Sequence, residues 1–233
     1  MKKELRSVLQ SHQNKFGPIV SFDPAKDKLL LLDLTTNNKD ISENILDDIN
    51  AFVEYINDQM KKANARYGIG GYNEHRTVYS RSKVFDAANE GEEPRRLHLG
   101  IDIWGKPHTA VMAPMDGIVH SYAFNDNFGD YGATIILSHL LDGINFYTLY
   151  GHLSLNSIKN IQEGDSINKG DVFAEFGIPA ENGHWPPHLH FQLIGDIGEW
   201  KGDYPGVCKF SEKEKWLLNS PDPDLLLQLN QYL

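Results

Sequence analysis

The sequence contains one cysteine, Cys208, among its 233 residues. A single cysteine excludes an internal disulfide and any zinc site built from cysteine thiolates. No base lies near it in the sequence, and we expect Cys208 to be an inert packing residue. The chain also lacks an apolar run of the ~18 residues that a membrane span needs, so no span is predicted.

Basic residues are outnumbered: 22 Lys and Arg stand against 32 Asp and Glu, for a formal net charge of −10. No basic stripe is available to neutralise phosphates, which argues against nucleic acid as the main partner. The same balance opposes passive adhesion to anionic membranes or wall polymers. The hydrophobic fraction of 40% is that of an ordinary globular chain, so intrinsic disorder is not predicted.

The first residues, Met1 to Leu5, carry charge but precede no apolar stretch, so no secretory signal is visible. As written, the sequence predicts a cytoplasmic protein. We expect an extracytoplasmic location instead if export follows another route or if the sequence has been trimmed.

The first third of the chain is predicted to mix strands and a helix. Two short strands are expected within 18–35, where apolar runs alternate with turn residues. Residues 43–64 place apolar side chains three and four apart, which predicts one amphipathic helix. The glycines of 68–71 are the strongest breakers in the chain. They predict a boundary between a small α+β N-terminal extension, 1–70, and a main domain, 71–233.

From residue 97 onward, short segments rich in Val, Ile, Phe and Tyr are bounded by Gly, Asp or Pro. Asp116-Gly117 and Asp142-Gly143 are typical of hairpin turns. No helical period appears before residue 200, so this half is predicted to be all-β. A short helix is expected within 222–232. The expected strands are 109–113, 117–123, 133–139, 144–150, 172–176 and 189–194.

Histidines and one carboxylate form spaced pairs on the expected strands. His98 and Asp102 lie four apart, and His188 and His190 lie two apart, so within a strand each pair shares a face. A catalytic zinc ion takes three nitrogen or oxygen ligands and keeps an open position for water. One imidazole and one carboxylate from the first pair, with one imidazole from the second, supply that set.

His152 follows Gly151 at the end of an expected strand. It is either an exposed turn residue or an acid/base or oxyanion-stabilising group beside the metal.

These three motifs, in this order, resemble those of the lysostaphin-type (LytM-like) zinc endopeptidases, which cut peptides of bacterial peptidoglycan. The resemblance covers roughly residues 96–196. It implies a mainly β fold, an antiparallel β-sandwich with a duplicated hybrid motif. The implied Zn²⁺ ligands are His98, Asp102 and His190, and the implied catalytic residues are His152 and His188.

The chain has no His-Glu-x-x-His motif, so the general-base glutamate of that zinc helix is missing. We therefore expect His152 and His188 to divide its work. One accepts the proton of water and the other, when protonated, stabilises the tetrahedral oxyanion. Either residue suits either role.

Three residues are expected to contact a substrate. Tyr150 precedes His152, and Arg76 would receive a substrate carboxylate, unless its polar segment is an ordinary turn. Trp185 either forms a wall of the groove or packs in the interior. The remaining histidines of this half are expected to be structural: His108, His120, His139 and His184.

The sequence thus predicts a zinc metalloendopeptidase hydrolysing amide bonds in peptides or peptidoglycan fragments, with a glycine- or D-amino-acid-containing substrate implied by the resemblance. Without export, the substrate would be a cytoplasmic peptide or a recycled wall fragment. One alternative is a non-catalytic peptide- or wall-fragment-binding module of the same fold, but all five site positions are filled. A histidine phosphocarrier needs no carboxylate, and the pairing of His98 with Asp102 opposes it.

Overall fold

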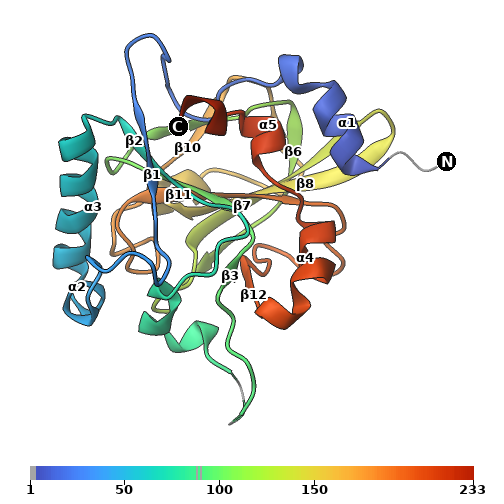
Figure 1. Ribbon diagram of the computed structural model, residues 1–233. Coiled ribbons are helices and arrows are strands. Elements are labelled where there is room, and N and C mark those ends of the chain that lie inside the picture. Colours follow the sequence, from blue (N-terminus) through green and yellow to red (C-terminus); the bar gives the residue numbers. More distant parts are fainter. Residues whose placement is uncertain (1–3, 88, 90) are drawn as a thin grey trace.

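The computed structural model describes residues 4–87, 89 and 91–233, and within them the protein is mainly β (Figure 1). An eight-stranded sheet has the order β1-β2-β4-β11-β8-β7-β6-β9, and β5–β10 and β3–β12 form two small sheets. The strands are β1 (Leu29–Leu32), β2 (Tyr67–Gly70), β3 (Leu97–His98), β4 (Ile101–Trp104), β5 (Ala110–Met112), β6 (Gly117–Asn125), β7 (Gly132–Leu141), β8 (Ile144–Leu153), β9 (Ser166–Ile167), β10 (Val172–Glu175), β11 (His188–Ile194) and β12 (Val207–Cys208). The helices are α1 (Leu5–Ser11), α2 (Glu43–Asp47), α3 (Ile49–Ala63), α4 (Lys213–Asn219) and α5 (Asp224–Leu227).

All six strands expected after residue 108 are present. The Asp142-Gly143 hairpin is confirmed between β7 and β8, with φ of 51° and 81° at the two residues, as a type I′ turn requires. The prediction of a hairpin at Asp116-Gly117 is wrong, because the strands on either side do not pair with each other. β5 pairs with β10, and β6 pairs with β7 and β9. Gly117 instead lets a histidine approach: a Cβ there would lie 2.7 Å from Cε1 of His139.

The single helix predicted over 43–64 is two helices, α2 and α3, separated at Asp48. The Asp48 backbone is extended, and its carboxylate accepts from Asn50 N at 2.8 Å and Ala51 N at 3.4 Å. An aspartate cap of this kind starts a new helix, since it satisfies amides that otherwise lack partners. Of the two strands predicted in 18–35, only β1 is present.

The glycines of 68–71 do not break the chain, because most of them lie inside β2. A Cβ on Gly68 would lie 2.3 Å from Leu32 Cδ1, and one on Gly70 would lie 2.5 Å from Arg76 Nη2. Glycine is required there by close packing rather than by a turn. β2 pairs with both β1 and β4, so the strands before residue 70 continue the sheet. The domain boundary at that residue stays a prediction.

The prediction of a mainly β chain is confirmed. Val111 of β5 and Ala174 of β10 pack in the main core with residues of the large sheet such as Ile135 and Phe191. The small sheet β5–β10 therefore packs on the same core as the large sheet. The large sheet is mixed rather than antiparallel throughout, because β1 pairs with β2 in parallel, and the predicted sandwich stays a prediction.

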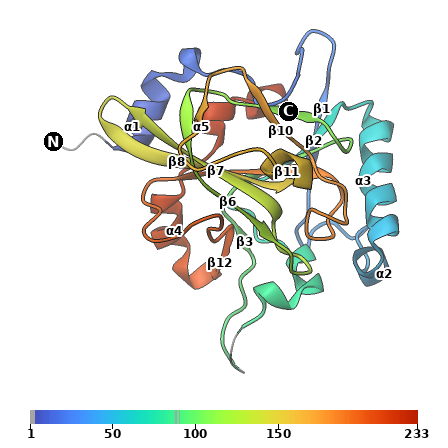
Figure 2. The same cartoon turned by 180° about the vertical axis from the view of Figure 1, so that it is seen from behind.

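Helix α3 packs beside β1 and β2, at the opposite side of the molecule from α4, as both views show (Figure 2). Its buried residues Phe52, Ile56 and Met60 share a core cluster with Trp104 and Trp185. The predicted C-terminal helix is present as α5. Among the described helices, none combines the length and apolar character that crossing a membrane requires.

The structural roles predicted for Cys208 and His139 agree with the burial of both side chains. Cys208 is 1% exposed, and burial raises the pKa of its thiol to about 12. His139 is 4% exposed on β7, where its Nδ1–H donates to Asp116 O at 2.8 Å and its Nε2 accepts from Thr148 Oγ1 at 2.7 Å. Burial lowers the pKa of His139 to about 4.

We expect the H139N variant to lose less stability in acid than the natural chain. The pKa of His139 in the folded protein lies below its unfolded value of 6.5. The neutral ring therefore stabilises the folded state fully above pH 6.5, and this stabilisation is lost as the pH falls towards 4. By pH 4 this loss reaches roughly 3 kcal/mol. Urea unfolding at pH 7 and pH 4.5 measures it. If the free energy of unfolding falls equally with pH in both proteins, His139 does not have a lowered pKa in the folded state.

Candidate metal centre

The predicted metal ligands come from three strands. His98 ends β3, Asp102 lies in β4, and His190 lies in β11 directly opposite Asp102. The expectation that His98 and Asp102 share one strand is wrong, because the chain bends between β3 and β4 and β3 pairs with β12. A Cβ on Gly100, within the bend, would lie 2.5 Å from His190 Cε1. Glycine at the bend therefore leaves space for the His190 imidazole.

The three ligand atoms form a compact triangle. His98 Nε2 lies 3.0 Å from His190 Nδ1 and 3.2 Å from Asp102 Oδ1, and the third side is 3.1 Å. Zinc–nitrogen and zinc–oxygen bonds of roughly 2.0–2.1 Å place neighbouring ligands of a tetrahedral ion about 3.3 Å apart. The triangle therefore has nearly the size of one face of such a tetrahedron.

The hydrogens of both imidazoles point away from this triangle. His98 Nδ1 lies 2.9 Å from Gly71 O, and His190 Nε2 lies 3.0 Å from Gln192 Oε1. Both partners are carbonyl oxygens that only accept, so these ring nitrogens carry the hydrogens. The facing nitrogens and the Asp102 oxygen then present three lone pairs to one another. A cation between them converts this repulsion into coordination, so the donor set fits a metal ion.

Burial and charge keep the ligands in the forms that bind metal. Burial lowers the pKa of His98 to about 4, so its imidazole is neutral. Burial alone raises the pKa of Asp102, but the neighbouring His98 and Arg76 outweigh it and hold that pKa well below its usual range. All three ligands are at most 3% exposed.

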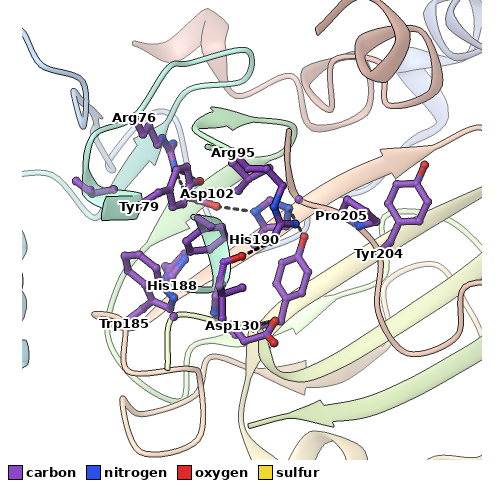
Figure 3. Close-up of a pocket in the computed structure, with 18 of the residues that line it drawn as sticks. Arg76, Tyr79, Arg95, Asp102, Asp130, Trp185, His188, His190, Tyr204 and Pro205 are labelled. Atoms are coloured by element: carbon purple, nitrogen blue, oxygen red, sulfur yellow. Dashed lines mark hydrogen bonds and ion pairs between the residues drawn. The ribbon is translucent and has the colours of Figure 1, made fainter. Parts of the chain in front are cut away.

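Arg76 lies against the metal-ligating carboxylate, as Figure 3 shows. Its Nη1 donates to Asp102 Oδ2 at 2.5 Å, its Nε donates to Glu74 Oε2 at 2.5 Å, and its side chain is 1% exposed. Nη1 also donates to Tyr79 Oη at 3.3 Å. The predicted contact with a substrate carboxylate stays untested, and these contacts favour a different role, that of orienting Asp102.

Gln192 is a supporting residue that the sequence reading missed. Its Nε2 donates to Pro205 O at 3.2 Å and to Ser220 Oγ at 3.0 Å, which directs Oε1 towards His190. Its position two residues after His190 on β11 places it on the same face as both histidines of that strand, and this spacing is the signal that could have revealed it.

The two predicted catalytic histidines lie side by side next to the triangle. The ring centroids of His152 and His188 are 4.1 Å apart. His152 Nδ1–H donates to Asn182 O at 2.8 Å, and His188 Nδ1–H donates to Pro186 O at 2.7 Å. Both Nε2 atoms are therefore left as acceptors. Burial lowers both pKa values, that of His188 to about 4, so both rings are neutral acceptors.

Two backbone and stacking features hold these histidines in place. His152 has a φ of 61°, in the left-handed region, where non-glycine residues are uncommon. It directly follows Gly151, the residue opposite His190 on β8. The His188 ring stacks on Trp104 with centroids 3.9 Å apart. The imidazoles are thus fixed by their surroundings before any ligand arrives.

His152 and His188 line one cavity together with Asp102 and His190, and Tyr79, Phe85 and the segment 203–207 also line it. Trp185 also lines it and is 4% exposed, so it is both a wall and a packed residue. Tyr150 is fully buried, and its ring packs on Phe173 and Phe191 of the core. That position leaves Tyr150 no surface for a substrate, contrary to the sequence-based expectation.

The metal triangle is the one cluster of this kind within the described residues, and none of the other histidines joins it. Exposed His108 pairs with half-buried Glu175 at 3.2 Å, and His120 contacts the Ser121 hydroxyl at 2.9 Å. These contacts agree with structural roles.

Residues 96–200 match the model of the family described as Peptidase family M23. An L-Ala–D-Glu endopeptidase of Bacillus subtilis is 33% identical over 148 residues, which is 60% of this chain and 43% of that protein. An uncharacterized metalloprotease of Haemophilus influenzae is 33% identical over 98 residues, 42% of this chain and 18% of that protein. The chain thus spans less than half the length of these curated relatives.

Among solved structures, the catalytic domain of the antimicrobial peptidase lysostaphin from Staphylococcus simulans is similar over 76% of this chain and 97% of that chain, with 22% identity and a TM-score of 0.43. The family-model match contains all five predicted metal-ligating and catalytic residues. Residues 96–200 of this chain are therefore similar to a peptidase family M23 domain.

Proposed function

We propose that the protein is a zinc metalloendopeptidase. The observation that carries this proposal is the triangle of three acceptor atoms, 3.0 to 3.2 Å apart, with both imidazole hydrogens directed outward. His98, Asp102 and His190 would hold the ion. A zinc ion bound there supplies a Lewis acid for the scissile carbonyl and lowers the pKa of its water to about 7.

The protein's own residues supply the proton transfers. His152 and His188 each present an unprotonated Nε2, because their Nδ1–H groups donate to carbonyl oxygens. One of them would accept the proton of the attacking water on Nε2 and pass it to the departing amine. The other would donate to the developing oxyanion after taking up a proton from solvent. Arg76 keeps Asp102 ionised and oriented, and Gln192 keeps the His190 lone pair directed at the ion.

The proposed substrate is a peptide of peptidoglycan or of a fragment derived from it. Support comes from the Bacillus subtilis relative, which is named an L-Ala–D-Glu endopeptidase. We propose that the chain acts wherever such fragments occur, in the cytoplasm on recycled material or outside it after export. The intact ligand set opposes a purely binding role, and the carboxylate within it opposes a phosphocarrier.

We expect ligand and catalytic variants to separate by zinc content. H98A, D102A and H190A should lose both zinc and hydrolysis, because two ligands do not hold the ion. H152Q and H188Q should keep one zinc per chain while hydrolysis of a wall peptide falls roughly 10²- to 10⁴-fold. Metal analysis after gel filtration and a peptide cleavage assay measure both. Zinc loss in H152Q would instead make His152 a ligand.

We expect R76K to weaken zinc binding about 10- to 100-fold, since one ammonium nitrogen does not replace the separate Nε and Nη1 donors that reach Glu74 and Asp102, and loss of hydrogen bonds to metal ligands has effects of this size. Competition with a chelator measures the zinc Kd. R66K is the matched control, because Arg66 is 43% exposed and pairs with Asp27 away from the site. Unchanged zinc affinity with a raised KM for acidic peptides would restore the substrate-contact role of Arg76.

A further inference from the structure

An open groove adjoins the metal cavity and is not used by the proposed mechanism. Aromatic side chains Trp200, Tyr204 and Trp216 line it, together with the charged Asp196, Lys201 and Lys215. Trp200 and Tyr204 also line the metal cavity. Tyr204 lies on the side of His190 away from Trp185 (Figure 3). The groove and the cavity therefore share Trp200 and Tyr204 as a common border.

The aromatic rings of the groove form a connected series. Trp200 and Tyr204 meet edge to face with centroids 6.1 Å apart and planes at 72°, and Tyr204 and Trp216 repeat this at 6.1 Å and 73°. Tyr204 is buried at 4% exposure, whereas Trp200 is 46% exposed. A large indole left open to water beside a cavity provides a flat apolar face for a ligand.

The groove is held rigidly by one amide. Asn219 Oδ1 accepts from Asp196 N at 2.9 Å, and its Nδ2 donates to Asp196 O at 2.8 Å and to Tyr204 Oη at 2.7 Å. These bonds tie the loop after β11 to the end of α4. The aromatic faces are therefore positioned before a ligand binds, which lowers the entropic cost of binding.

Aromatic faces surrounded by charged and hydrogen-bonding side chains suit a sugar ring. A pyranose has one apolar face of C–H groups, which stacks on an indole, and a rim of hydroxyl and amide groups, which needs polar partners. The exposed charges are of both signs, with Lys201 paired to Glu163 at 2.9 Å. A mixed rim of this kind favours a neutral sugar over a strongly charged ligand.

We propose that this groove binds an N-acetylated amino sugar of the glycan to which the cleaved peptide is attached, with the sugar stacked on Trp200. The inference rests on the proposed function, because the border shared with the metal cavity is what assigns the occupant. Wall peptides are covalently joined to such sugars, so a peptide in the cavity brings its glycan to the adjoining surface.

The W200A and W200F variants test the proposal. The probe for binding is the β-1,4-linked tetramer of N-acetylglucosamine, titrated by calorimetry into the zinc-loaded protein. We expect W200A to weaken its binding about tenfold or more, as loss of an aromatic anchor does elsewhere, and W200F to retain most of it. For cleavage, W200A should raise KM for a disaccharide-linked peptide about tenfold more than it raises KM for the same peptide without sugar.

L218A is the matched control, because Leu218 is 86% exposed on α4 and lies outside the groove lining. Unfolding midpoints of all variants check that the fold is intact. Equal loss on both peptides in W200A, or tetramer binding that does not depend on Trp200, overturns the proposal. If no peptide is cut, the proposed function fails, and calorimetry still decides whether the groove binds sugar.

Discussion

Three acceptor atoms from three strands lie as close together as the ligands on one face of a tetrahedral metal ion. Much of the surrounding structure makes this close approach possible. β11 lies between β4 and β8, so it brings His190 opposite Asp102 on one side and Gly151 on the other. Gly100 provides the space for His190, and Gly70 provides the space for the Arg76 guanidinium. Each of these glycines replaces a side chain that would collide with a ligand or its support.

Burial gives the centre its chemistry and also makes it depend on its supporting residues. A buried carboxylate without a partner would become protonated, and Arg76 prevents this by donating to Asp102. The imidazoles of His98 and His188 are neutral for the complementary reason, since burial lowers their pKa values. Such a buried ion pair adds little net stability, and removing one partner is costly. Arg76 is therefore better explained by metal binding than by folding.

The sequence was sufficient for features encoded over short distances. The alternation of His188 and His190 with apolar residues identified β11, and Asp142-Gly143 identified a hairpin. Other features depend on contacts between distant segments. Arg76 reaches Asp102 across 26 residues, and the need for Gly70 arises only once that contact exists. The helical spacing of apolar residues continues past Asp48, but the chain starts a new helix there because the Asp48 side chain caps α3. The spacing of apolar residues alone does not reveal this cap.

The buried site and the more open groove together indicate how binding energy is distributed. The five site residues are at most 6% exposed, so a peptide that reaches them must displace neighbouring side chains. That displacement has a cost in free energy, and contacts remote from the reacting bond are able to offset it. Trp200 offers such a contact without any rearrangement, because it is already exposed. A substrate that bears a sugar on its peptide would thus open the cavity more readily than the peptide alone.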